Sequence, residues 1–267
     1  MKLHFTKMQG LGNDFIIIDS VSQDVQLHED FIKKIADRHY GVGCDQVLLL
    51  EPPRTAEEDF FYRIFNSNGS EVEQCGNGVR CLAKFIHEHQ FSSKKTIKIA
   101  TIKTKMEVTL YGDGMVKVNM GEPIVDAQNW VLDLEKQQFE FVLLSMGNPH
   151  AVTCVDKIDE APVNSVGAQV SMHSDFPLQT NVGFMQIQNR HQIALRVYER
   201  HEGETLACGS GACAAVAAGI LQGKLGERVD VYLQGGMLKV EWKGTGHPLW
   251  MSGPAKKVFI GTYDADE

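Results

Sequence analysis

The chain lacks both a long hydrophobic run and a long basic run. Its longest apolar stretch, residues 212–220, is far shorter than the ~20 residues that a membrane-spanning helix needs. Residues 1–15 contain no apolar core of a signal peptide, so we expect a cytoplasmic protein that neither spans a membrane nor leaves the cell. Lys and Arg never occur in runs longer than a pair and the formal net charge is −8, which argues against nucleic-acid binding through a basic face.

Recognisable cofactor and metal motifs are also missing. Gly10-Leu-Gly12 lacks the third glycine of a dinucleotide-binding fingerprint, and no Lys lies in a phosphate-binding loop, so pyridoxal phosphate is not implied. The cysteines do not show the CxxC-like spacing of structural zinc sites. Without a secretion signal they are expected to be reduced thiols. The six are Cys44, Cys75, Cys81, Cys154, Cys208 and Cys213.

Strand patterns dominate the chain, and helices are fewer. Two of the expected helices, 77–89 and 210–222, each follow a Cys-Gly-X-Gly sequence, and the second is apolar on all sides and so must be enclosed. Two further helices are expected at 29–39, ended by Gly41, and at 162–172, opened by Pro162. The expected strands are 3–8, 15–19, 47–50, 60–65, 96–101, 105–120 with a hairpin turn at 111–114, 139–145, 151–155, 182–187, 193–198, 229–233, 237–242, 249–252 and 256–262.

The strongest signal is an internal repeat. Cys75 lies nine residues after Asn66 and four after Glu71, and Cys208 has the same spacing from Glu199 and Glu204. The segments Arg63-Ile-Phe-Asn66 and Arg196-Val-Tyr-Glu199 match, as do Gly12-Asn13 and Gly147-Asn148. Asn13 and Gln46 are as far apart as Asn148 and Asn181. The repeat predicts two similar domains, each with one cysteine at the start of a helix.

Two opposed thiols at helix starts suit a particular chemistry. A helix N-terminus carries partial positive charge and free N–H groups, which bind an anion and lower the pKa of a nearby thiol. One thiolate can remove a proton from one face of a carbon centre while a thiol delivers a proton to the other face. The two helix ends stabilise charge that builds on an adjacent carboxylate. We therefore expect a small carboxylate substrate held between Cys75 and Cys208 in a cleft between the domains.

These segments resemble the diaminopimelate epimerase family. The resemblance runs over residues 7–215 and rests on KMQGLGNDF, RHYGVGCDQ, FNSNGSEVEQCGNGVRC, MGNPHAV, TNVGF and YERHEGETLACGSGACA, in the family's order. It implies an isomerase that interconverts LL- and meso-diaminopimelate without a cofactor or metal, in the synthesis of lysine and peptidoglycan precursors. It also implies an α+β fold of two pseudo-symmetric domains, each a curved, mostly antiparallel sheet around a central helix.

The resemblance implies a role for each matching residue. Cys75 and Cys208 are the acid/base pair, His150 and Glu199 tune the thiols, and Arg200 suits the distal carboxylate. The substrate-binding set is Asn13, Gln46, Asn66, Gly76, Asn77, Asn148, Asn181, Glu199, Arg200, Gly209 and Ser210, with the backbone N–H groups of Gly76, Asn77, Gly209 and Ser210 on the α-carboxylate.

The expected domains are residues 1–119 plus 254–267, and residues 120–253, with the C-terminal strand returning to the first domain. The resemblance also suggests a homodimer. Cys44 and the pair His201-Glu202 depart from the commonest family pattern, which affects local packing and none of the roles above. Cys44, Cys81, Cys154 and Cys213 are expected to be core residues, because cysteine behaves as a small hydrophobe.

Three alternatives stay open. A proline or hydroxyproline racemase also uses paired cysteines, although it needs no partner for a distal carboxylate. A redox module would use the two thiols as a disulfide without acting on amino acids. An isomerase of the same fold without catalytic thiols is disfavoured by the presence of both cysteines.

Overall fold

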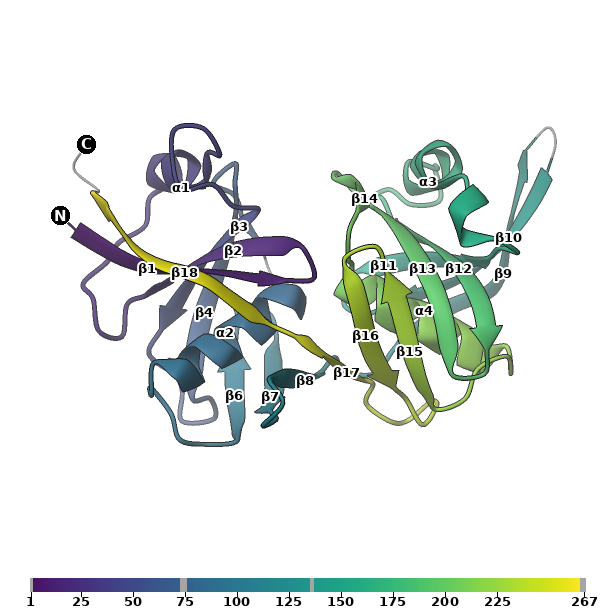
Figure 1. Ribbon diagram of the computed structural model, residues 1–267. Coiled ribbons are helices and arrows are strands. Elements are labelled where there is room, and N and C mark those ends of the chain that lie inside the picture. Colours follow the sequence, from purple (N-terminus) through teal and green to yellow (C-terminus); the bar gives the residue numbers. More distant parts are fainter. Residues whose placement is uncertain (1, 73–75, 135–136, 265–267) are drawn as a thin grey trace. The chain divides into compact units, whose positions relative to one another are not determined.

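The computed structural model describes residues 2–72, 76–134 and 137–264. These residues form two compact units (Figure 1). The first unit contains residues up to Val118 together with the segment from Gly253 onward, and the second unit is Asn119–Ser252. No helix in the described residues is both long and apolar enough to cross a membrane.

The first unit is a mixed sheet packed around one buried helix. Strand β1 pairs antiparallel with both β18 and β2, β2 pairs parallel with β3, and β3 pairs antiparallel with β4. Beyond β4 lie β6, which is parallel to it, and then the antiparallel strands β7 and β8. The strands are β1 (Lys2–Gly10), β2 (Asn13–Asp19), β3 (Gln46–Glu51), β4 (Phe60–Asn66), β5 (Glu71–Val72), β6 (Thr96–Ala100), β7 (Lys105–Leu110), β8 (Met115–Asn119) and β18 (Lys256–Asp264), and the helices are α1 (Glu29–Ala36) and α2 (Gly76–Glu88).

The second unit repeats this order strand for strand. Strand β10 pairs with β9 and β11, β11 is parallel to β12, and β12 pairs antiparallel with β13. Beyond β13 lie its parallel neighbour β15 and then β16 and β17. The strands are β9 (Ile124–Leu134), β10 (Gln137–Ser145), β11 (Pro149–Cys154), β12 (Asn181–Asn189), β13 (Gln192–Glu199), β14 (Gly203–Thr205), β15 (Arg228–Leu233), β16 (Gly236–Glu241) and β17 (Trp250–Pro254), with η1 (Ile158–Glu160) and the helices α3 (Val163–Ser171) and α4 (Gly209–Leu221).

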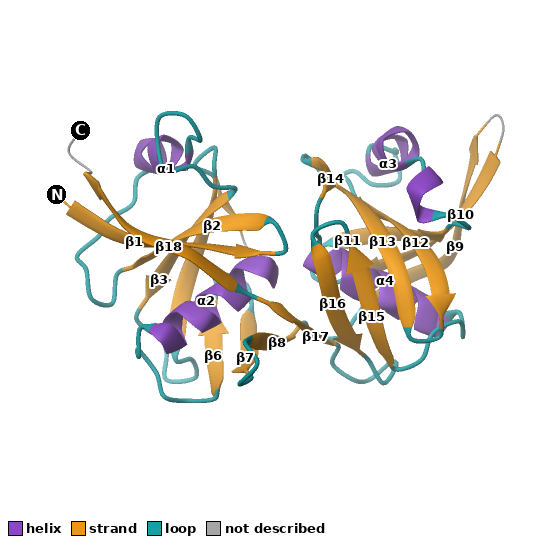
Figure 2. Ribbon diagram, in the orientation of Figure 1, coloured by secondary structure: helices purple, strands orange, loops and turns teal. Residues whose placement is uncertain are grey.

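Equivalent elements carry equivalent contacts in the two units. Helix α2 packs against β1, β2 and β3, and α4 packs against β10, β11 and β12 (Figure 2). Arg63 pairs with Glu71 through two hydrogen bonds of 2.9 and 2.7 Å, and Arg196 pairs with Glu204 in the same way at 2.6 and 2.9 Å. The repeat seen in the sequence is therefore a repeat of structure, and the predicted α+β fold is confirmed.

Helix α4 is enclosed, as its composition predicts. Gly209 and every residue from Gly211 to Gly219 are buried. Small residues fill most of these positions, so the surrounding strands approach the helix closely. The apolar character of α4 on all sides reflects this central place in the unit.

Three expectations about local structure are wrong. The first helix ends at Ala36 and not near Gly41, because the Asp37 carboxylate accepts hydrogen bonds from the N–H groups of His39 and Tyr40 and turns the chain. Strands β5, β9 and β14 are not among the expected strands. Cys154 is exposed, since it is the last residue of β11, whereas Cys44, Cys81 and Cys213 are buried as expected.

Candidate active site

Cys208 caps the N-terminus of α4. Its backbone is extended, its side chain is only 4% exposed, and its Sγ accepts a hydrogen bond of 3.4 Å from the N–H of Gly211. The N–H groups of Gly209 and Ser210 belong to the first helical turn, where N–H groups have no partner within the helix. The thiol therefore lies at the end of the helix that can bind an anion.

Glu199, the last residue of β13, contacts the Cys208 thiol directly. Its Oε2 accepts from Sγ at 3.1 Å, and its Oε1 accepts from the Thr205 hydroxyl at 2.5 Å. Burial raises the pKa of the Glu199 carboxyl group, while the hydrogen bonds from Thr205 and Cys208 oppose that rise. One carboxylate is thus held between a hydroxyl group and the thiol.

The expectation that the helix end lowers the thiol pKa is wrong for Cys208. Burial and then the neighbouring Glu199 carboxylate raise the pKa of this thiol well above its ordinary value. The hydrogen bonds from Ser210 and Gly211 act in the opposite direction but are weaker. Cys208 is therefore a protonated thiol that donates to Glu199, which is the state required of a general acid.

His150 reaches the thiol only through two intermediate residues. It is 2% exposed, and its Nε2 donates to Asn148 Oδ1 at 3.0 Å. Asn148 Nδ2 donates to Ser210 Oγ at 3.3 Å, and Ser210 Oγ lies 3.6 Å from Cys208 Sγ. Burial lowers the pKa of His150 to about 3, and the charge of Arg200 acts in the same direction. His150 is therefore neutral and orients Asn148.

The buried neutral state of His150 predicts a pH dependence of stability. An unfolded His has a pKa of ~6.5, so below that value the unfolded chain binds a proton that the folded protein does not. The free energy of unfolding should then fall by up to ~1.4 kcal/mol for each pH unit between pH 6 and 4 from this group. Urea unfolding at several pH values gives the free energy of unfolding as a function of pH. Between pH 6 and 4 this free energy should change less steeply with pH for His150→Asn than for the wild type. Exposed His247→Asn is the matched control, and equal slopes for all three proteins would contradict the buried neutral state.

Asn181 and Arg200 belong to the same unit as Cys208 and are joined by a hydrogen bond. The Asn181 side chain donates to the carbonyl oxygen of Pro149 at 3.2 Å and accepts from the backbone N–H of Arg200 at 3.1 Å. The Arg200 guanidinium group donates to the carbonyl oxygen of Leu178 at 3.4 Å. Asn181 is 2% exposed, so its amide fixes the backbone from which the Arg200 side chain projects.

The first unit brings together the equivalent residues on β2, β3, β4 and α2. Asn77 Nδ2 donates to Asn13 Oδ1 at 3.4 Å, which joins the start of α2 to the start of β2. Gln46 Nε2 donates to Asn66 Oδ1 at 2.8 Å across the pair β3–β4. Gly76 is the first residue of α2. Cys75, the predicted partner of Cys208, lies outside the described residues.

An ion-pair network that contacts Asn13 was not predicted from the sequence. Asp45 Oδ2 accepts from Asn13 Nδ2 at 2.8 Å, and Asp45 Oδ1 accepts from Arg38 at 2.6 Å. Arg38 also binds both carboxylate oxygens of Asp14, which Lys7 approaches to 2.7 Å. Burial would raise the pKa of Asp14, but the hydrogen bonds from Arg38 and Lys7 hold it below its ordinary value. The signal in the sequence is adjacency to predicted residues, since Asp14 follows Asn13 and Asp45 precedes Gln46.

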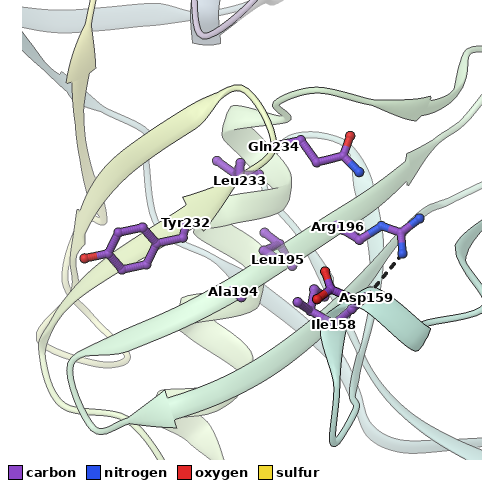
Figure 3. Close-up of a pocket in the computed structure, with 8 residues that line it drawn as sticks. All are labelled: Ile158, Asp159, Ala194, Leu195, Arg196, Tyr232, Leu233 and Gln234. Carbon is purple, nitrogen blue, oxygen red and sulfur yellow. Dashed lines mark hydrogen bonds between the residues drawn. The ribbon is translucent and has the colours of Figure 1, made fainter.

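A groove of about 430 Å³ in the second unit contains none of the predicted site residues (Figure 3). Arg196 is the basic residue in its lining, and its guanidinium group is already bound to Glu204 and to the carbonyl oxygens of Ile158 and Ala161. The remaining lining residues are Ile158, Asp159, Ala194, Leu195, Tyr232, Leu233 and Gln234. Within the described part of the chain, no three His, Cys, Asp or Glu side chains are grouped to hold a metal ion.

Solved structures of other proteins share the fold of this chain. A hydroxyproline epimerase from Agrobacterium vitis superimposes with a TM-score of 0.75 at 13% identity, covering 98% of this chain and 92% of that one. A PhzF-family phenazine biosynthesis protein from Bacillus anthracis superimposes with a TM-score of 0.74 at 15% identity, covering 98% and 99%. At these identities the likeness concerns the fold alone.

Sequence comparison identifies the family. The family model described as diaminopimelate epimerase matches residues 5–125 and 142–258. A diaminopimelate epimerase from Teredinibacter turnerae is 47% identical over 272 aligned residues, which cover 98% of this chain and 99% of that protein. The chain belongs to the diaminopimelate epimerase family.

Proposed function

We propose that this enzyme interconverts LL- and meso-diaminopimelate by proton transfer at one α-carbon between two cysteine side chains. Family membership supports the substrate and the reaction. The observation that carries the mechanism is the state of Cys208, a buried protonated thiol at a helix N-terminus that is hydrogen-bonded to Glu199. The reaction belongs to lysine biosynthesis, and we infer that its product also feeds peptidoglycan synthesis.

In one direction Cys208 is the acid. The thiolate of Cys75 takes the α-proton, the electron pair left behind is delocalised into the α-carboxylate, and Cys208 delivers its proton to the opposite face. The thiolate and thiol are thereby exchanged, so the reverse reaction starts with the roles reversed. The first-turn N–H groups of Gly76, Asn77, Gly209 and Ser210 stabilise the charge on the carboxylate. These steps need no cofactor, in agreement with the cofactor independence of the family.

The remaining site residues bind the two ends of the substrate. Arg200 presents a planar fork of donors that fits the distal carboxylate. Arg200 directly follows Glu199 in the sequence. Two adjacent side chains can therefore bind an anionic group and a cationic group of the substrate. Glu199 can accept from the substrate ammonium group when that group approaches Cys208. The amide side chains that complete the pocket are Asn13, Gln46, Asn66, Asn148 and Asn181.

Chiral chromatography of purified protein with LL-diaminopimelate tests this function. We expect the meso isomer to accumulate to an equilibrium mixture, with the same rate after addition of pyridoxal phosphate or after treatment with EDTA. Parallel incubations with L-proline and trans-4-hydroxy-L-proline should show no inversion. Inversion of the cyclic amino acids, or no inversion of any substrate, would contradict the proposal. We also place the enzyme in the cytoplasm, where a reducing environment keeps both thiols free.

We infer further that the enzyme is a homodimer. Strand β18 exposes three consecutive apolar residues, Val258 (56%), Phe259 (45%) and Ile260 (59%). Because consecutive strand residues point to opposite faces, apolar side chains are exposed on both faces of this strand. Such an exposed apolar strand favours pairing with a second copy. Analytical ultracentrifugation should show a dimer for the wild type and for Val21→Lys, and a monomer for Ile260→Lys. A monomeric wild type, or a dimeric Ile260→Lys, would argue against this interface.

A further inference from the structure

We propose that Thr205 is a positioning residue that holds the Glu199 carboxylate against the Cys208 thiol. This inference deepens the proposed function, because it assigns a residue that prepares Cys208 for proton transfer. Thr205 lies at the end of β14, which pairs antiparallel with β13, and β13 ends at Glu199. The hairpin therefore brings the hydroxyl group of one strand to the carboxylate of the other.

The geometry gives each carboxylate oxygen of Glu199 a separate partner. The Thr205 hydroxyl donates to Oε1 at 2.5 Å and the Cys208 thiol donates to Oε2 at 3.1 Å. With Oε1 fixed, the carboxylate has little freedom to turn Oε2 away from the thiol. Thr205 is itself half-buried, and its register on β14 is set by the pairs Val197↔Thr205 and Tyr198↔Glu204. The short hydrogen bond therefore joins two groups that the sheet already holds in place.

The positions of the first unit that are equivalent to Thr205 and Glu199 lack this arrangement. Val72 ends β5 at the position that Thr205 occupies on β14, and Asn66 ends β4 at the position of Glu199 on β13. Neither Val72 nor Asn66 carries an ionisable side chain, and Val72 has no hydroxyl group. Asn66 instead accepts a hydrogen bond from Gln46. A fixed carboxylate therefore accompanies the cysteine of the second unit and has no counterpart at these positions of the first.

This asymmetry has a chemical consequence. A negative charge fixed beside Sγ favours the thiol over the thiolate. Cys208 therefore stays protonated until it transfers its proton to the α-carbon of the substrate. Burial and the Glu199 carboxylate both raise the pKa of Cys208, and the Thr205 hydrogen bond helps to keep Glu199 ionised by lowering its pKa. Loss of the hydroxyl group should therefore leave Glu199 more often neutral and Cys208 more often a thiolate.

Thr205→Val tests the inference, since it makes the second unit resemble the first at this position. We expect kcat to fall about 10- to 100-fold, the range for loss of a hydrogen bond to a charged group, while KM changes less than about twofold. Thr205→Ser keeps the hydroxyl group and should restore kcat to within about threefold of the wild type. Thr96→Val is the matched control, because half-buried Thr96 also loses one strand-to-strand hydroxyl contact, to Thr109 at 3.0 Å, in the other unit.

Alkylation of the cysteines provides a readout that does not depend on the reaction. After a short exposure to iodoacetamide, peptide mass spectrometry measures labelling of Cys208 and Cys75 in the same sample. Labelling of Cys208 relative to Cys75 should rise several-fold in Thr205→Val and stay at the wild-type ratio in Thr205→Ser and Thr96→Val. An unchanged ratio and a kcat within twofold of the wild type would overturn the inference, as would a Ser variant as impaired as the Val variant. Failure of the wild type to act on diaminopimelate would instead contradict the proposed function.

Discussion

Cys208→Ala should lower the rate of epimerisation by about 10²–10⁴-fold, the usual cost of losing a positioned acid or base. Cys208 donates to Glu199 and caps α4, so no other described side chain occupies the same place beside the helix end. Cys75→Ala should cost as much, because a proton source on one face cannot replace a base on the other. Initial rates in both directions, followed by chiral chromatography, give the measurement.

Cys154→Ala provides the control for this prediction. Cys154 is an exposed cysteine at the end of β11 in the same unit as Cys208, so its loss should leave the rates within about twofold of the wild type. Cys208→Ser retains a donor of similar size with a much higher pKa and should remain strongly impaired. Near-wild-type turnover by either the Cys75 or the Cys208 alanine variant would mean that the two-base assignment is incorrect.

Arg200→Lys should be a severe substitution although it preserves the charge. Lysine lacks the planar pair of donors that fits a carboxylate, so the distal end of the substrate loses its fixed orientation. Diaminopimelate has two stereocentres, and the enzyme has to place one of them at the thiols and keep the other away. Since a misplacement of ~1 Å can cost ~10²-fold in rate, we expect kcat/KM to fall by about that factor, with both parameters affected.

Steady-state kinetics with LL- and meso-diaminopimelate measure the effect of Arg200→Lys. Arg190→Lys, a change at an exposed arginine before β13, should leave both parameters unchanged. The backbone N–H of Arg200 is bound by the buried Asn181 side chain, so the substitution should not move the main chain. Wild-type kinetics for Arg200→Lys would remove this residue from the binding site.

The repeat allowed the fold to be predicted further than the strand patterns alone. Matching spacings around Asn66 and Glu199 indicated duplicated domains, and the two units do share their strand order and the ion pairs Arg63–Glu71 and Arg196–Glu204. Strand β9 escaped detection because its pairing with β10 shifts register between Trp130 and Ala127. That bulge breaks the alternation of apolar and polar residues on which strand prediction depends.

The chemistry of the site could be predicted only in part. A cysteine at a helix start indicated a low thiol pKa, but the burial of Cys208 and the charge of Glu199 have the larger effect and raise it. These contributions depend on three-dimensional contacts that a single sequence does not show. Thr205 and Asp45 were missed for the same reason, since each acts by contacting a predicted residue, Glu199 or Asn13.

Solvent deuterium incorporation tests the central claim of two-base proton transfer most directly. LL-diaminopimelate is incubated with the enzyme in D₂O, and samples are taken in the initial phase of the reaction. The two isomers are separated, and the deuterium content of each is measured by mass spectrometry. If one cysteine removes the proton and the other supplies a solvent-derived one, nearly every molecule of meso product should carry one deuterium at the inverted α-carbon. The recovered LL isomer should at that stage remain largely unlabelled. A meso product that retains the substrate's own proton would show that a single base serves both faces, and would contradict the account.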